Sequence, residues 1–267
     1  MIAIGISEFS FGYAFLHEQT LAQWNNLTAA PILPSLQQEA DAGWDAHLPI
    51  EGDAFFYQFK LSDYLFNHNA LYISDGTYAS PYYRVFLHRR ENNRQHRLLR
   101  AHCQTNPNTF YVAPELQTIP EFNAAFLAHN LTVHTRLFSL VDCEDIQPTD
   151  GSQHCITFQP GEPNWDFHSA RVRKQRSFFG SHLEDLYTER TKVLRPIDVG
   201  FARDLLERST TSAREFGAEE ADAAIAVTRR LLEARVGAAG RREILQRVAD
   251  LSATVFGLTM VIVGPHN

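Results

Sequence analysis

The stretch from Pro34 to Lys60 constrains the fold of this chain more than any other part of the sequence. Two runs within it have the composition of β-strands, Gly43 to Leu48 and Phe55 to Lys60. Between them stands Glu51-Gly52-Asp53, in which glycine supplies the positive φ that a tight turn needs. We therefore expect two adjacent antiparallel strands, the first with an acid near its start and the second ending in a polar-x-Lys pair.

Three side chains of these strands suggest a phosphate chemistry. Gln58 and Lys60 share a face of their strand, because side chains alternate along a strand with a period of two. Asp45 faces this pair across the ladder when the register aligns them. A carboxylate is a hard oxygen ligand suited to Mg²⁺, and a lysine stabilises charge on a phosphoryl group or orients the attacking water. The three residue types together predict a site that holds a divalent cation beside a phosphate.

The pattern of Asp45 followed by Gln58-x-Lys60 resembles the PD-(D/E)xK nuclease superfamily, most closely the restriction-endonuclease-like branch in which glutamine replaces the acid of the (D/E)xK element. The resemblance covers roughly residues 1–115. It implies an α/β fold with an αβββαβ core around a mixed central sheet, and a Mg²⁺- or Mn²⁺-dependent nuclease. The implied catalytic residues are Asp45, Gln58 and Lys60 with Glu39 and Glu8, and the implied metal ligands are Asp45, Gln58 and Glu39.

The order of elements expected from residue patterns alone is the order of that core: helix, strand, strand, strand, helix, strand. The expected strands share a high content of β-branched and aromatic residues; they are the pair within residues 44–60 and residues 82–88, 109–113, 132–141 and 154–158. Ser7 can cap a first helix, and Asn92 or Asn93 a second. The expected helices are residues 9–26, with Leu16, Leu21 and Trp24 on the inner side, residues 93–103 and residues 120–130.

Three regions follow from this reading. Residues 1–160 form the expected nuclease core. Residues 161–195 are polar and basic, and predict a connecting loop with at most one helical turn, either solvated or in contact with nucleic acid. Residues 196–267 are rich in alanine and arginine and carry two apolar stripes at helical spacing, the second running from Ile244 to Ile262. We expect a C-terminal helical extension that packs on its own domain or on a partner subunit.

The distribution of charge along the chain predicts a nucleic-acid interface, although the total charge does not. The net charge is −7, which does not favour a nucleic-acid binder, but local clusters matter more than the sum. Residues 84–100 hold six arginines and one acid, so a basic helix near residues 89–100 can bind the phosphate backbone without reading sequence. The candidate nucleic-acid-binding residues are Arg84, Arg89, Arg90, Arg94, Gln95, His96 and Arg97.

Several classes of protein are disfavoured. Three cysteines without paired spacing argue against a disulfide scaffold or a cysteine-based zinc site. The first four residues are too short and too uncharged for a signal peptide, and no apolar run approaches the ~20 residues of a membrane span. We expect a cytoplasmic protein. The chain has no GxxxxGK[ST], HExxH or GxSxG motif, so P-loop ATP binding, zinc-protease and serine-hydrolase chemistry lack support.

The function implied by the resemblance is that of an endonuclease, a hydrolase that cuts nucleic acid, DNA favoured, in a prokaryotic restriction or antiviral defence system. A second hypothesis is a catalytically silent subunit of the same fold that binds nucleic acid or a partner protein, with the C-terminal helices as the docking surface. The glutamine in place of an acid and the negative net charge favour that alternative. A third, a small-molecule hydrolase on an α/β scaffold, is weakened by the absence of a nucleophile motif.

Overall fold

The structure is a computed structural model, and it describes part of the chain. The described residues are 2–24, 53–68, 70–74, 76–79, 81–87, 93–105, 107–169, 172–183, 185–186, 200, 204, 207–208 and 259–263. Asp45, Glu39, Arg89 and Arg90 lie outside these residues, as does most of the expected C-terminal helical extension.

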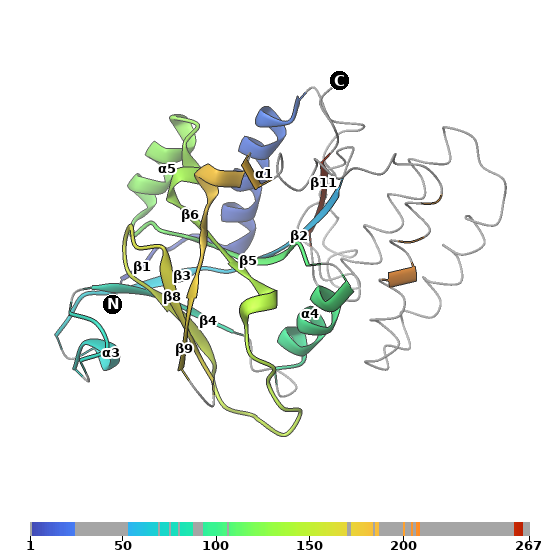
Figure 1. Cartoon of the computed structure of the whole chain (residues 1–267). Helices are drawn as coiled ribbons and strands as arrows, with labels where there is room; N and C mark the ends of the chain where they lie inside the picture. Colours follow the sequence, from blue (N-terminus) through green and yellow to red (C-terminus); the bar gives the residue numbers. More distant parts are fainter. Residues whose placement is uncertain are drawn as a thin grey trace. The chain divides into compact units, whose positions relative to one another are not determined.

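The chain is a mixed α/β protein, as expected (Figure 1). The helices are α1 (Glu8–Ala22), α3 (Leu71–Ser74), α4 (Arg94–Thr105) and α5 (Ile119–Leu127), with 3-10 turns η2 (Leu131–His134), η3 (Leu140–Asp142) and η4 (Gly180–His182). The strands are β1 (Ile2–Ala3), β2 (Asp53–Phe59), β3 (Ser62–Leu65), β4 (Tyr82–Phe86), β5 (Thr109–Pro114), β6 (Thr135–Ser139), β7 (Cys155–Phe158), β8 (Asn164–His168), β9 (Val172–Arg176), β10 (Phe178–Phe179) and β11 (Thr259–Val263).

Two compact units divide the chain. The first unit comprises Met1–Glu18, Phe59–Arg97 and Phe110–Leu183, and the second comprises Gln19–Gln58, Leu98–Thr109 and Glu184–Asn267. The first unit contains an antiparallel six-stranded sheet of order β1-β3-β4-β7-β8-β9. Glu8, Lys60 and Gln95 belong to the first unit, and Gln58 belongs to the second.

The other sheet is mixed and has the order β10-β6-β5-β2-β11. The pairs β10–β6, β6–β5 and β2–β11 are antiparallel. Strands β2 and β5 run parallel, because the amide of Phe56 donates to Asn108 O (2.8 Å) and the amide of Lys60 donates to Val112 O (2.9 Å), with the same offset between partners. A mixed sheet that includes the end of β2 is therefore present.

Aromatic side chains form the core of the first unit. Tyr83, Phe158 and Trp165 are buried cross-strand neighbours on one face of the six-stranded sheet. Phe138, on β6, packs against this face, with its ring centroid 5.2 Å from that of Phe158 and 5.3 Å from that of Trp165. Large rings bury much apolar area and interlock edge to face, so this layer fixes β6 against β7 and β8.

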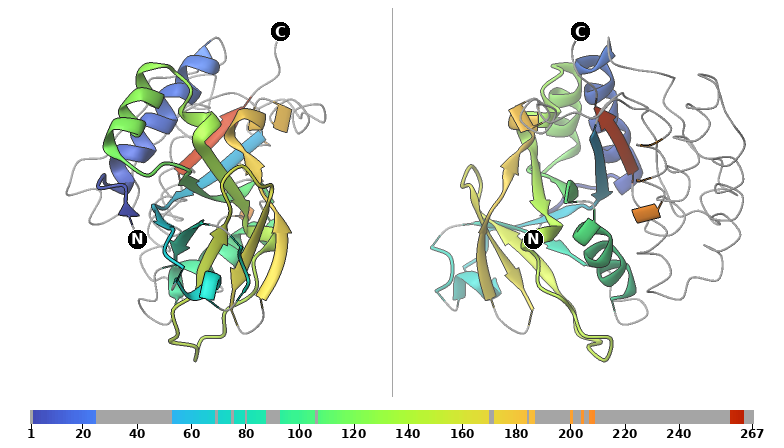
Figure 2. Two further views of the ribbon diagram at one scale, coloured as in Figure 1. Left: turned by 90° about the vertical axis from the view of Figure 1, so that its left-hand side faces the viewer. Right: turned by 45° about the vertical axis from the view of Figure 1, so that its right-hand side comes forward.

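Helices α1 and α5 lie side by side, as two views show (Figures 1 and 2). The rings of His17 on α1 and Phe126 on α5 are 5.3 Å apart. The buried carboxylate of Glu18 accepts hydrogen bonds from the amides of Leu131 and Thr132, the latter at 2.8 Å, at the start of η2. A single acid thus satisfies two backbone donors that the turn cannot satisfy itself.

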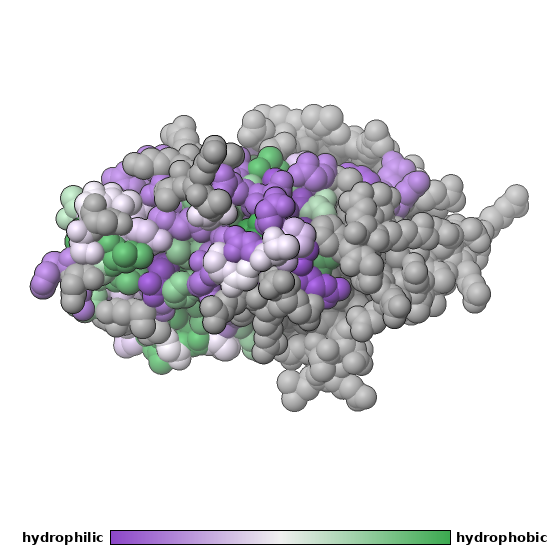
Figure 3. All heavy atoms as spheres, turned by 90° about the horizontal axis from the view of Figure 1, so that it is seen from below, coloured by the Kyte–Doolittle hydropathy of each residue, from purple (hydrophilic) through white to green (hydrophobic). Residues whose placement is uncertain are grey.

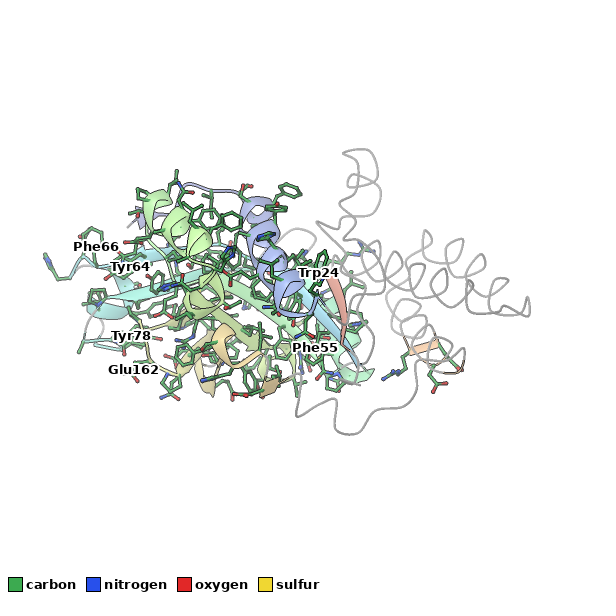
Figure 4. All side chains as sticks on the ribbon, turned by 90° about the horizontal axis from the view of Figure 1, so that it is seen from above. Trp24, Phe55, Tyr64, Phe66, Tyr78 and Glu162 are labelled. Atoms are coloured by element: carbon green, nitrogen blue, oxygen red, sulfur yellow. The ribbon has the colours of Figure 1, made fainter. Side chains whose placement is uncertain are left out.

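The first helix is shorter than expected and exposes more of its surface. Leu16 is buried as predicted, but Leu21 and Trp24 are exposed, Trp24 with 66% of its surface accessible (Figure 4). The described part of the surface seen from below mixes hydrophilic residues with smaller hydrophobic areas (Figure 3). An apolar residue at helical spacing is therefore no proof of burial, because exposed apolar residues are common on folded surfaces.

The predicted element order is confirmed in part within the residues that the structure describes. α1, β2, β4, α4 and β5 follow one another in the expected order, and β3 is an additional strand that was not expected. Among the described residues, the neighbours of β2 are β5 and β11, and the expected partner strand at residues 44–48 lies outside the described residues. β3 and β4 belong to the six-stranded sheet, so the strands of the expected core are divided between two sheets.

Two further expectations are wrong. Residues 164–168 and 172–176 form the paired strands β8 and β9, where a loop was expected, and β8 pairs with β7 across the expected domain boundary at residue 160. Residues 259–263 form β11, where the apolar stripe had predicted a helix. The β-branched residues Val261, Ile262 and Val263 favour an extended strand, and β2 supplies the partner.

Candidate functional site

Three of the predicted site residues meet around one ammonium group. Lys60 follows β2 directly, and its Nζ donates a hydrogen bond to Gln95 Oε1 at 3.3 Å. The same Nζ lies 3.8 Å from Glu8 Oε1. Glu8 is the first residue of α1, and Gln95 is in the first turn of α4. We call this arrangement of Glu8, Lys60 and Gln95 the Lys60 cluster.

The Lys60 cluster reaches solvent mainly through its acid. Lys60 itself is 1% exposed, whereas 35% of the Glu8 side-chain surface is accessible. Gln95 is half-buried. An enclosed ammonium requires a compensating charge or strong acceptors, and Glu8 with Gln95 supplies both. The acid is thus placed where a ligand from solvent can meet it, while the lysine lies behind it.

Local sequence explains why Glu8 reaches this position. Ser7 caps α1, because the amide of Ser10 donates to Ser7 Oγ at 3.0 Å. An acid in the first turn of a helix is favoured by the helix dipole. Gly12 follows Glu8 by one turn, on the same side of the helix.

Gly12 permits α1 to lie close against the end of β2. A Cβ atom at residue 12 would be 2.8 Å from the ring of Phe59, the residue before Lys60. That ring is enclosed by Phe11 and Phe15, with centroid separations of 5.8 Å and 5.6 Å. The ring therefore cannot move aside easily, and the missing side chain lets the helix start approach Lys60.

The start of α4 is anchored by backbone contacts to a distant loop. Asn93 has a left-handed φ of 60°, and its carbonyl accepts the first helical bond, from Arg97 N at 3.2 Å. Its side-chain amide donates to the carbonyls of Asp150 (2.9 Å) and Ser152 (3.3 Å). Helix α4 begins directly after Asn93, as the sequence predicted, but the Asn93 side chain donates to the loop and does not cap the helix.

Of the three predicted metal ligands, the structure describes only Gln58. Gln58 is buried on β2, two residues before Lys60. Among the described residues, no group of three or more His, Cys, Asp or Glu side chains has an arrangement that holds a metal ion. Glu8 and Gln95 offer hard oxygen donors of the kind Mg²⁺ takes, so they fit such an ion in kind. A full ligand set needs further acids, for which Asp45 and Glu39, outside the described residues, are the candidates.

The predicted nucleic-acid-binding residues fall into two groups. Arg94 and Arg97 are half-buried on α4. Arg84 is 18% exposed in its side chain, pairs with Asp63 at 3.2 Å, and lies 4.1 Å over the ring of Phe86, so its charge is already compensated. His96 is buried with 1% exposure, and its prediction as a nucleic-acid contact is wrong.

Sequence reasoning missed a buried polar network on the other face of the six-stranded sheet. Tyr78 OH donates to Asp166 Oδ2 at 2.5 Å and lies 2.7 Å from Thr157 Oγ1, which in turn lies 2.7 Å from His168 Nε2. Burial, followed by the bond to Asp166, raises the pKa of Tyr78 above its ordinary range. The signal was present, because Asp166 and His168 alternate with Trp165 and Phe167 as in a half-buried strand.

A second group has the residue types of a serine hydrolase but not its geometry. Ser152 Oγ lies 3.2 Å and Asp150 Oδ2 lies 3.3 Å from the same nitrogen, His154 Nε2. A catalytic triad places serine and acid on opposite ring nitrogens. Here Ser152 donates its hydroxyl proton to Asp150, and bonds from Ser152 hold the pKa of that carboxyl below its usual range. The arrangement closes a turn and offers no activated nucleophile.

No protein-family model, curated protein sequence or solved structure matches this chain. The resemblance to the PD-(D/E)xK superfamily therefore remains a prediction that rests on the chain's own residues. Within the part of the chain that the structure describes, no helix has both the length and the apolar character needed to cross a membrane.

Proposed function

We propose that this protein is a metal-dependent nuclease that hydrolyses phosphodiester bonds, with DNA the favoured substrate, on a PD-(D/E)xK-like core. The observation that carries the proposal is the Lys60 cluster. An ammonium, a carboxylate and an amide oxygen from three separate elements converge at the residue that the Gln58-x-Lys60 pattern had singled out. Such convergence of side chains from the ends of different elements is typical of catalytic sites.

The roles of the residues follow from their charges. Lys60 stabilises negative charge on the phosphoryl group during in-line attack, and Gln95 holds the ammonium in one orientation. Glu8 would contribute to holding Mg²⁺ or Mn²⁺, and the metal ligands that the resemblance implies are Asp45, Glu39 and Gln58. When bound, that ion supplies charge neutralisation and activates water. Arg94 and Arg97 lie on the same helix as Gln95 and would hold the nucleic-acid backbone.

The biological setting is proposed from the resemblance alone. Nucleases of this kind act in prokaryotic restriction and antiviral defence, which suggests a cytoplasmic enzyme.

The decisive experiment is cleavage by the full chain with Mg²⁺ or Mn²⁺, compared with Lys60→Met and Glu8→Gln. Each substitution keeps the side-chain length and removes one charge. We expect cleavage to fall roughly 100-fold or more in both variants, the scale for losing one group that stabilises transition-state charge. Glu121→Gln, at the first-turn acid of α5, is the matched control and should cut normally. Undiminished cleavage by a folded Lys60→Met protein would refute the proposal.

A catalytically silent subunit is the second candidate, and the burial of Lys60 favours it. An ammonium with 1% exposure is also what a purely structural ion pair shows. This candidate predicts binding of nucleic acid or a partner without cleavage under any divalent metal, and unchanged binding in Asp45→Ala. Docking would use the C-terminal extension, most of which lies outside the described residues.

A further inference from the structure

His96, the residue after Gln95, joins three separate parts of the first unit. Its Nδ1 lies 3.0 Å from the hydroxyl of Tyr111 on β5, and its Nε2 lies 2.8 Å from the carbonyl oxygen of Glu144, just after η3. Its ring stacks on Phe167 of β8, with centroids 5.5 Å apart at 27°. The side chain is 1% exposed, so these contacts are made out of reach of solvent.

The chemistry of the partners fixes the state of the ring. A carbonyl oxygen only accepts, so Nε2 must carry a proton and donate to Glu144. In the neutral ring Nδ1 is then the acceptor, and the hydroxyl of Tyr111 donates to it. One tautomer therefore satisfies both bonds, and the imidazole is held in a single orientation.

This orientation sets how α4 is turned about its own axis. Successive residues of a helix are related by about 100°, so fixing His96 fixes the direction in which Gln95 projects. A side-chain atom lies roughly 5 Å from a helix axis, so a rotation of about 20° displaces it by about 1.7 Å. Such a displacement is enough to break the 3.3 Å bond between Gln95 Oε1 and Lys60 Nζ.

We infer that His96 is the positioning residue of the Lys60 cluster: by clamping the first turn of α4 to Tyr111 and Glu144, it holds Gln95 against Lys60. In this role His96 acts through its neighbour Gln95. The effect of His96 on cleavage rests on the proposed nuclease function, whereas its effect on the surroundings of Lys60 does not.

The chain offers a direct probe, because it contains only three lysines, Lys60, Lys174 and Lys192. Lysine labelled with ¹³C at Cε gives three NMR signals in the full-length protein, and Lys60→Arg identifies the signal of Lys60. The test variant is His96→Asn, which keeps an acceptor near the Nδ1 position and loses the donor to Glu144. The rescue variant is His96→Gln, whose amide nitrogen takes the place of Nε2.

The matched control is Tyr78→Phe, which removes a buried hydroxyl from the same unit and leaves His96 untouched. We expect the Lys60 signal to move in His96→Asn, to return toward its wild-type position in His96→Gln, and to stay fixed in Tyr78→Phe. Cleavage should fall roughly 100-fold in His96→Asn, as for a misplacement of about 1 Å, with little change in KM. If His96→Asn does not fold, Tyr111→Phe, which removes the other bond, is measured in its place.

The outcomes separate the two proposals. A Lys60 signal that is the same in the wild type and in a folded His96→Asn or Tyr111→Phe protein overturns the positioning role. A signal that shifts as expected in a protein that cleaves no nucleic acid supports the positioning role and counts against the nuclease function. Equal losses of activity in His96→Asn and Tyr78→Phe, with the Lys60 signal unmoved in both, would show a general structural effect and also overturn the inference.

Discussion

Lys60 and Arg136 are both enclosed cations of the first unit, and their surroundings differ in a way that bears on function. Arg136 pairs with Glu115 at 3.3 Å and donates through Nε to Ser177 Oγ at 3.1 Å. Burial lowers the pKa of Arg136, while Glu115 opposes that shift. Glu115 is itself mostly enclosed, with 13% of its side chain exposed, whereas Glu8 is open to solvent. Arg136 therefore has the surroundings of a structural ion pair, and Lys60 has a partner that a ligand can reach.

A buried histidine predicts sensitivity to acid. Burial, with a smaller effect of the Arg208 charge, lowers the pKa of His102 from 6.5 to about 3, and its ring packs on Phe56 at 4.4 Å. Below pH 6.5 the imidazole of His102 binds a proton in the unfolded chain but stays neutral in the folded chain. The free energy of unfolding therefore decreases as the pH falls from 6.5 toward 3. The free energy of unfolding should fall by about 1.4 kcal/mol per pH unit, or about 2 kcal/mol at pH 5.

Urea unfolding at pH 7 and pH 5 measures this loss. His102→Leu should lose clearly less stability between the two pH values than the wild type. His68→Leu, at an exposed histidine, is the control and should follow the wild type. Parallel losses in all three proteins would assign the acid sensitivity to other groups.

At the level of single residues, the sequence predicted which side chains carry suitable functional groups better than it predicted which of them are buried. Lys60 could be selected from the Gln58-x-Lys60 pattern, and Glu8 and Gln95 from the resemblance to the nuclease superfamily, and the three meet. His96 was assigned to nucleic-acid binding because it lies on the basic helix, where the resemblance also implies a polar residue. Its burial depends on Tyr111, Glu144 and Phe167, none of which is close to it in sequence, so no local pattern could reveal it.

At the level of elements, local patterns identified most helices and strands of the first unit but not their partners. β4, β5 and β7 were expected from their aromatic and β-branched residues. The partner of β2 was not, because β11 lies at the opposite end of the chain and its apolar residues also suit a helix. The basic residues of β9 concealed a strand, since their register opposite β8 becomes visible only in the sheet.

The pairing of β11 with β2 predicts a specific truncation effect. Deleting residues 259–267 removes the five residues that pair with Asp53–Tyr57 and leaves an unpaired strand edge. The free energy of unfolding should fall by at least about 2 kcal/mol, because several ladder bonds of about 1 kcal/mol each are lost. The exposed edge should also promote aggregation on heating.

Thermal unfolding with light scattering tests this expectation. Deleting residues 264–267 alone keeps β11 and serves as the matched control. A shorter chain that lacks residues 259–267 but unfolds at the temperature of the control would show that β11 adds nothing to the stability of β2.

At the scale of the whole molecule, the reactivity of the three cysteine thiols measures whether each of the two units is folded. Cys103 belongs to the second unit, whereas Cys143 and Cys155 belong to the first, and all three are buried. Burial is also the main cause that raises the pKa of Cys155. We expect a thiol reagent such as DTNB to find no reactive group within minutes in the folded protein and three after unfolding in urea. Prompt reaction of one thiol without denaturant would contradict this, and a Cys103→Ser variant would assign it to a unit.

One close approach that bears on the site is made by a residue with no side chain, Gly12. Gly12 has no group that could bind, donate or react, yet the helix start can sit beside the strand end only because nothing projects from it toward Phe59. Even alanine there would meet the enclosed ring of Phe59, so the helix start would have to move away from the strand end that carries Lys60. If a mutational scan finds that substitutions of Gly12 abolish function, the cause would be the lost close packing of α1 against the end of β2, because glycine has no reactive group. A search for functional residues that considers only polar side chains would miss this position.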